Sequence, residues 1–479
     1  MIESKQYYLD CFSVTERDLD TLVGEALGSG GGYCDLYFEN TSYRNLLLRD
    51  SAVSSGGLHI DYGVGIRVLD GEKTGYAYSE STDMASMTRA AKAAATITGG
   101  RTAIPDRRTS DHRYFGRPNP AADRYPMASN WRQSPLGPQA DLLRRLDALV
   151  RAKDSRVSKV IGMLSSSVSD VLMYNSFGEM KYETRPMGNV ALTVIFTQNG
   201  KVENRSVSRS FRAGSEMLTD SLVEEMASQA VRDLDASFEA RRPKGGRMSV
   251  VMGAGASGIL LHEAMGHAFE ADFNRKGQSI FSDRMGQRVC PKGVTVVDDG
   301  TIRGNRGAVN FDDEGVPGQY TVMVEDGILT SYLHDRISAS FYGVAPTGNG
   351  RRESFRYNPI PRMRATYMEN GDAEPRSIIA SVRKGVYVDE FSNGQVKIGE
   401  GDFTFYVKRG RLIENGRLTM PVKDINIIGN GPKALADIEA VGNDLRIDNG
   451  TWTCGKEQSA PVSCGMPTVL VNNLTVGGE

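Results

Sequence analysis

The sequence has few cysteines, little net charge and no long apolar run. Five cysteines are scattered over 479 residues, which argues against a disulfide framework. No stretch of about 18 apolar residues occurs, so a membrane-spanning helix is excluded. The formal net charge is −2, and this balance calls for neither nucleic acid nor an anionic membrane as a partner. The polar start shows no secretory signal, and we expect a reduced, cytoplasmic protein.

Histidine is equally scarce, yet two of the five histidines lie in one short run, His262-Glu263-Ala264-Met265-Gly266-His267. Imidazole nitrogens are the usual zinc ligands, and a neighbouring carboxylate can take a proton from an activated water. The run therefore favours a metallohydrolase in which Glu263 reaches the water. The alternative is two helical histidines at chance spacing, because short motifs also match by accident.

The spacing of this motif needs a distorted helix. Residues five apart on a regular α-helix lie about 140° apart around the axis, too far for His262 and His267 to share one ion. A single π-type turn absorbs the extra residue, and such turns gather at functional sites. Gly266 offers the backbone freedom for it. The pattern predicts a helix that starts near Ser257 and is widened around Met265 and Gly266.

A glycine-rich turn precedes the motif and allows a second interpretation. Gly253–Gly258 matches G-x-G-x-x-G between an apolar strand and a helix, which is the dinucleotide-binding fingerprint. No acidic residue ends a second parallel strand about twenty positions later, as ribose binding requires. We favour a simple glycine turn and keep nucleotide binding as an alternative.

A zinc site needs a third protein ligand, and composition alone leaves several candidates. They are Glu270, Asp272, His334 and the cysteines Cys11, Cys34, Cys290, Cys454 and Cys464. A single buried cysteine is usually a small apolar core residue. Cys454 differs, because it lies in a polar, glycine-flanked loop where Lys456 could favour the thiolate.

Several segments resemble the TldD/PmbA family. The segment from His262 to Gly277 resembles the zinc motif of its proteases, and residues 312–315, 343–354, 441–445 and 472–478 match further family stretches. The resemblance implies zinc held by His262, His267 and Cys454, with Glu263 as the general base. It leaves Cys464 without a role. The chain departs from the family pattern at the glycine turn and at Trp452, which affects the shape of the pocket.

The resemblance also implies an activity and a partner. Members of the family hydrolyse unfolded or flexible peptides in a dimer that encloses the active sites. The chain carries the motif of the catalytic branch, so we expect a heterodimer with a motif-less TldE/PmbA-like partner, or a homodimer. A non-catalytic peptide-binding or assembly subunit is the alternative. Candidates for stabilising the oxyanion are Arg351, Arg352 and His334, although each suits an ordinary structural role as well.

Glycine- and proline-rich turns and the periodicity of apolar residues divide the chain into two predicted domains of an α+β protein. Residues 1–240 are predicted as an α/β domain with a large antiparallel sheet, and residues 241–479 as a β-rich, barrel-like domain that carries the metal helix. The segment 241–246 is the expected linker. Strands are predicted within 34–78 and 159–212, helices at 15–27, 82–97, 139–153, 216–236, 335–342 and 433–440, and an irregular segment at 101–138.

Overall fold

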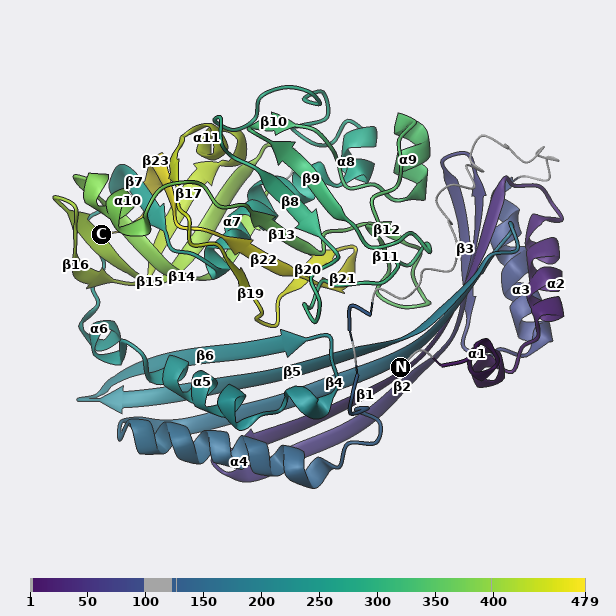
Figure 1. Ribbon diagram of the computed structural model, residues 1–479, viewed down its shortest axis with the longest axis horizontal. Coiled ribbons are helices and arrows are strands. Elements are labelled where there is room, and N and C mark those ends of the chain that lie inside the picture. The colour runs from purple at the N-terminus through teal and green to yellow at the C-terminus, as the bar shows by residue number, and fades with distance from the viewer. Residues whose placement is uncertain (1–2, 99–122, 126, 398, 479) are drawn as a thin grey trace.

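The computed structural model describes residues 3–98, 123–125, 127–397 and 399–478 (Figure 1). Most of the segment 101–138, predicted as irregular, lies outside the described residues. Within them, no helix is both long enough and apolar enough to cross a membrane. The molecule is a mixed α+β structure, as the sequence predicts. One long sheet carries the first half of the chain, and a closed barrel with a second sheet carries the rest.

The N-terminal part is built on six strands in the order β3-β2-β1-β4-β5-β6. All neighbours are antiparallel, and the sheet curves into a half-barrel (Figure 1). The large antiparallel sheet predicted from the sequence is therefore confirmed. The strands are β1 Tyr33–Arg49, β2 Ala52–Asp70, β3 Lys73–Ser79, β4 Val157–Asn175, β5 Met180–Gln198 and β6 Lys201–Phe211. The β5–β6 turn has positive φ at Asn199 and Gly200, as a type I′ hairpin requires.

Side-chain alternation decides what each face of this sheet contacts. On β1, Leu36, Phe38, Leu46 and Leu48 point to one face, and helices cover that face in two groups. One group is α1 Lys5–Phe12, α2 Glu16–Leu27 and α3 Met84–Ala95, and the other is α4 Leu136–Lys153, α5 Asp220–Val231 and α6 Leu234–Glu239. On the opposite face, Tyr37 packs with Phe311 and Phe355 of the C-terminal part.

Four of the predicted helices agree with the structure, and two are shorter. The predicted helix at 216–236 is broken, because Asp233 takes a left-handed conformation between α5 and α6. The predicted helix at 433–440 ends early: α11 spans Gly431–Ala436, and strand β18 (Ile438–Val441) follows it. Helix α9 (Arg336–Tyr342) begins after the N-cap Asp335, whose side chain accepts from Ser338 N, and agrees with the prediction.

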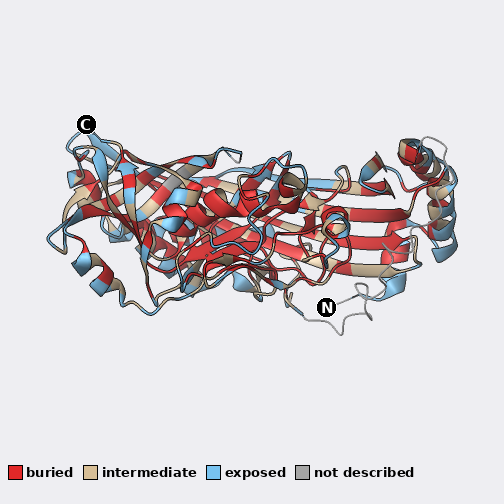
Figure 2. Ribbon diagram, turned by 90° about the horizontal axis from the view of Figure 1, so that it is seen from above, coloured by how far each residue is buried: buried red, intermediate tan, exposed pale blue. Residues whose placement is uncertain are grey.

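The C-terminal part contains a closed five-stranded barrel, β14-β7-β23-β17-β15, in which β14 pairs with β15. This confirms the predicted barrel-like build. Its strands are β7 Gly246–Met252, β14 Lys384–Val396, β15 Asp402–Glu414, β17 Ile425–Asn430 and β23 Val469–Val476, with β16 Arg417–Val422 alongside. Buried residues follow the barrel and the long strands (Figure 2).

A second, six-stranded sheet lies beside the barrel in the order β10-β9-β8-β13-β22-β19. Its strands are β8 Val296–Asp299, β9 Tyr320–Glu325, β10 Ile328–Leu329, β13 Ala365–Met368, β19 Arg446–Asp448 and β22 Ser463–Met466. This part also contains two short strand pairs and three short helices. The strand pairs are β11 Gly350–Arg351 with β12 Ile360–Pro361, and β20 Thr453–Lys456 with β21 Gln458–Pro461. The helices are α7 Ile259–Leu261, α8 Ala271–Arg275 and α10 Pro375–Ser381. The segment between β7 and α8 passes between the barrel and this sheet.

Candidate metal centre

The helix that follows β7 has the local widening that the histidine spacing requires. It begins with a 3₁₀ turn at Ala256–Gly258, continues as α7, and forms a π turn at His262–Gly266. His267 N–H donates to the carbonyl of His262, five residues earlier. The extra residue is absorbed, and the two imidazole rings lie 5.1 Å apart between centroids. The predicted start near Ser257 and the predicted widening are both confirmed.

Two glycines let this helix pack closely. A Cβ on Gly266 would overlap the side chain of Met363, and a Cβ on Gly258 would overlap the backbone of Gly465 in β22. Strand β7, which leads into the glycine turn, is parallel to β14 and antiparallel to β23. Close helix–strand packing thus explains Gly258 without a bound nucleotide.

Three donor atoms from distant parts of the chain converge at this helix. The Nε2 atoms of His262 and His267 each lie 3.1 Å from Cys454 Sγ, and the three donors are all within 4.8 Å of one another. Cys454 comes from β20, and the three side chains are buried. In the described part of the chain, none of the other ligand candidates joins this group.

The donor set fits a zinc ion. Imidazole nitrogens and thiolates are zinc ligands, and catalytic zinc sites use three protein ligands and keep a fourth position open. Burial raises the pKa of the Cys454 thiol, but His262 and His267 lower it by more, and the resulting pKa is about 5. The cysteine therefore favours the thiolate, which is the form that binds metal. His262 Nδ1 is buried and has no hydrogen-bond partner among the residues that the structure describes.

A charged residue behind His267 fixes the orientation of this histidine. Glu270 Oε2 lies 3.0 Å from His267 Nδ1 and 3.0 Å from Lys456 Nζ. Burial raises the pKa of Glu270, but Lys456 and His267 together hold it down at about 2. Lys456 also contacts Asp272 at 2.7 Å. Lys456 thus neutralises carboxylates, and the histidines, not this lysine, favour the Cys454 thiolate.

The donor group opens onto a cavity of about 600 Å³. Glu263, beside the first histidine, lines this cavity, and burial raises its pKa. The cavity is otherwise walled by Phe273, Trp452 and Cys464, and by the end of β14 at Gly394, Gln395 and Val396. A carboxylate with a raised pKa beside an open ligand position has the properties of a proton acceptor for hydrolysis.

The predicted oxyanion residues serve other contacts. Arg351 donates to the carbonyls of Met363 and Pro461, and Arg352 contacts Asp313, which agrees with their structural interpretation. His334 packs against Tyr332 and Tyr342. None of the three lines the metal cavity.

Two buried arginines beside the site were missed by the sequence analysis. Arg362 donates to the carbonyl of Cys454 at 2.7 Å and to that of Gln458 at 2.6 Å. Arg306 donates to the carbonyl of Trp452 at 2.8 Å. They hold the ligand strand by its backbone. Because they lie about 90 and 150 residues away along the chain, no local pattern could have indicated them.

Comparisons with known protein families match nearly the whole chain. Models of the PmbA/TldA metallopeptidase match in three consecutive pieces: domain 1 over residues 34–98, the central domain over 130–237 and the C-terminal domain over 245–478. A metalloprotease TldD homolog from Haemophilus influenzae is 39% identical over 455 residues, covering 93% of each chain. A zinc metalloprotease TldD homolog from Saccharolobus solfataricus is 34% identical, over 49% of this chain and 53% of its own.

Solved structures share the fold. A candidate modulator of DNA gyrase from Bacteroides thetaiotaomicron superposes with a TM-score of 0.77 at 19% identity, covering 97% of this chain and 99% of its own. TldE from Thermococcus kodakarensis gives a TM-score of 0.71 at 18% identity, covering 96% and 100%. At these identities the likeness concerns the fold alone.

Proposed function

Because the chain belongs to the PmbA/TldA metallopeptidase family, we propose that it is a zinc-dependent protease of unfolded or flexible peptides. The proposal assigns His262, His267 and Cys454 as ligands and Glu263 as the general base. The observation that carries it is the convergence of three buried donor atoms, two from a π turn and one from a strand 187 residues away.

The chain's own residues supply positioning and proton transfer. A zinc ion, when bound, supplies a Lewis acid that polarises the scissile carbonyl and lowers the pKa of water. Glu263 takes the proton of the attacking water and returns it to the leaving amine. Glu270 holds His267 through Nδ1, which leaves Nε2 directed at the donor group, as outer-shell carboxylates do at metal sites.

The end of β14 supports an extended peptide as the substrate. Its pairing with β7 spans only Gly385 to Val388, so within the described residues the strand has one unpaired edge beyond that point. Gly394 and Val396 at its end line the metal cavity. A peptide added to this edge would be held mainly by its backbone, which suits substrates of varied sequence.

The decisive experiment compares Glu263→Gln with the wild-type protein. We expect Glu263→Gln to lower kcat for a flexible reporter peptide by at least about 100-fold, because it removes the proton acceptor, while bound zinc stays stoichiometric. Cys454→Ala is the complementary variant and should lose the metal. Metal-free wild-type protein and unchanged activity in Glu263→Gln would instead favour the non-catalytic peptide-binding or assembly subunit.

Assembly and compartment belong to the same proposal. We propose a dimer, either with a motif-less partner or with a second copy, and the structural likeness to a TldE protein supports a relationship of this kind. All five cysteines are unpaired in the structure, which suits a reducing compartment such as the cytoplasm. Size measurement of the purified protein, with and without a TldE-like chain, distinguishes the two assemblies.

A further inference from the structure

A groove outside the metal cavity runs between the N-terminal sheet and the C-terminal barrel. It consists of two adjoining cavities of about 1270 and 440 Å³. Both are lined by Asn204 of β6 on one side and by Tyr387, Asp389, Lys408 and Arg409 of the barrel on the other. Because these residues line both cavities, the two cavities adjoin, and together they are called the groove.

Strand β14 connects this groove to the metal cavity. Tyr387 and Asp389 line the groove, Phe391 lines its larger cavity, and Gly394 lines the metal cavity. Trp452, two residues before the ligand Cys454, lines both the larger cavity and the metal cavity. A chain that extends from the metal along β14 therefore passes Trp452 and enters the groove.

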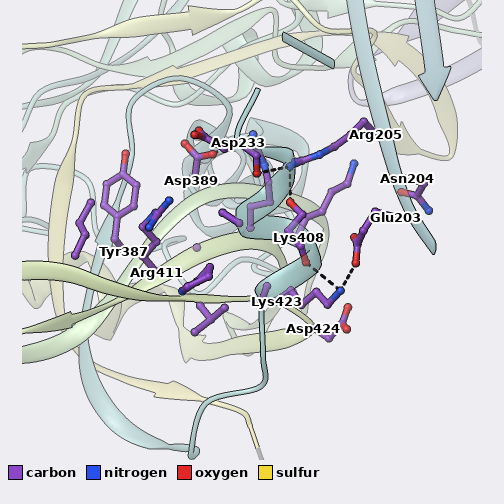
Figure 3. A pocket seen from close by; sticks show the side chains of 18 of the residues that line it. Glu203, Asn204, Arg205, Asp233, Tyr387, Asp389, Lys408, Arg411, Lys423 and Asp424 are labelled. Atoms are coloured by element: carbon purple, nitrogen blue, oxygen red, sulfur yellow. Dashed lines mark hydrogen bonds and ion pairs between the residues drawn. The ribbon is translucent and has the colours of Figure 1, made fainter. Parts of the chain in front are cut away.

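The far end of the groove contains a buried arginine that forms no ion pair within the described residues. Arg205 reaches from β6 toward Asp233 (Figure 3), and it is only 5% exposed. Its guanidinium donates to the Asp233 carbonyl at 3.4 Å and to Ser237 Oγ, both uncharged acceptors. Its Nε has no hydrogen-bond partner in the described part of the chain. Burial and the nearby Arg409 lower the pKa of Arg205 to about 10, although the carboxylates of Glu390, Glu203 and Asp389 oppose this shift.

Arg205 differs from the other buried arginines by its place in the groove. Arg212, Arg306 and Arg351 also donate to uncharged acceptors, but none of these three lines the groove. The buried Arg67, by contrast, has carboxylate partners, Asp35 among them. Within the 440 Å³ cavity the other cations are mostly paired: Lys423 with Glu203, Arg409 with Asp389 and Glu390, and Lys408 with Glu390. Arg411 lines the same cavity and adds a third guanidinium to those of Arg205 and Arg409.

We propose that the Arg205 cavity binds a carboxylate of the peptide whose scissile bond lies at the metal, so that the groove selects substrates long enough to reach it. A guanidinium and a carboxylate form short, charge-assisted hydrogen bonds, and the peptide supplies the charged hydrogen-bond partner that Arg205 lacks within the described residues. The carboxylate is either the C-terminus or an acidic side chain. This inference rests on the proposed protease function.

The test uses zinc-loaded protein with its partner, if one is required, and two series of flexible peptides of increasing length. One series compares a free C-terminus with a C-terminal amide, and the other compares an interior glutamate with glutamine. In one of the two series, above a threshold length, we expect the peptide with the carboxylate to have a KM about tenfold lower than its uncharged counterpart, with similar kcat. The shortest peptides should show no difference, because they cannot span the groove.

Arg205→Gln should abolish the preference for the carboxylate form and leave cleavage of short peptides unchanged, and Arg205→Lys should retain part of it. Arg144→Gln, an exposed arginine on α4, is the matched control and should behave as wild type. Equal KM values for both forms at every length would overturn the inference, and so would an Arg205→Gln variant that raises KM for both forms alike. Absence of all peptide hydrolysis would instead count against the proposed function.

Discussion

At the scale of single residues, charge partners decide how the metal centre is held. His267 stands between Cys454 on one nitrogen and Glu270 on the other. Glu270 in turn is neutralised by Lys456 and lies 3.6 Å from Arg362. The carboxylate therefore remains ionised in a buried place and can polarise the imidazole. The orientation of one proposed ligand thus depends on residues that would never touch the metal.

Glu270→Gln should weaken zinc binding while leaving all three proposed ligands in place. Loss of such an outer-shell carboxylate typically costs about 10- to 100-fold in metal affinity. A competition titration with a chromogenic chelator measures this directly. Asp272→Asn is the control, because Asp272 contacts the same lysine but neither histidine. Unchanged affinity in Glu270→Gln would show that the carboxylate serves only the packing of Lys456.

His334 should make the fold sensitive to mild acid. Burial lowers its pKa to about 4 from an ordinary value of 6.5, so the native state resists protonation and the unfolded chain accepts it. Stability is then complete above pH 6.5 and falls as the pH drops towards 4, by about 3 kcal/mol at most. Urea denaturation between pH 4 and 7.5 should show a smaller pH-dependent loss in His334→Leu than in wild type. Parallel curves would contradict the assignment.

At the scale of elements, the sequence predicts what is encoded locally. Helix α2 was predictable from its helical spacing, and in the structure Thr15 and Asp18 form a capping box at its start. The π turn followed from the spacing of two histidines. The break at Asp233 was missed because a left-handed aspartate leaves little trace in helical periodicity. The strand β18 was missed because its pairing with β23 is a tertiary contact. The hydrogen bond from Arg362 to the Cys454 carbonyl is also a tertiary contact, so the sequence did not predict it.

In the helix that carries His262 and His267, a methyl group added at Gly258 should be more destabilising than one added at Gly266. Gly258→Ala pushes a methyl group into the backbone of Gly465, which cannot move away, whereas Gly266→Ala meets the flexible side chain of Met363. We expect Gly266→Ala to cost about 1–3 kcal/mol of stability and Gly258→Ala to cost more and to lose bound zinc.

Thermal unfolding and metal analysis of the two variants provide the comparison. Gly266→Ala combined with Met363→Ala should cost less stability than the sum of the two single changes, because the truncated side chain makes room for the new methyl group. No such rescue exists for Gly258→Ala. A milder effect at Gly258 than at Gly266 would mean that the close approach of helix and β22 is not needed to form the site.

At the scale of the whole molecule, the two proposed domains, 1–240 and 241–479, share a charged and apolar interface. Arg67 of β2 is fully buried between Asp35 of β1 and Glu314 of the C-terminal part, and its contact with Glu314 is 2.6 Å. Phe311 and Phe355 pack on the same face of the sheet. We therefore propose that the division near residue 240 separates units of structure that are not independently stable.

A double-mutant cycle on Arg67 and Glu314 tests this coupling. Glu314→Gln leaves the buried guanidinium with Asp35 as its remaining strong partner, and breaking a buried pair typically costs about 3–5 kcal/mol. Arg67→Met should cost a similar amount, and the double variant should cost less than the sum, with a coupling of at least about 1 kcal/mol. The exposed pair Lys5–Glu16 is the control cycle and should show no measurable coupling. Additive costs at Arg67 and Glu314, or two separate unfolding transitions in the wild type, would mean that each half folds without the other and that the interface only holds them together.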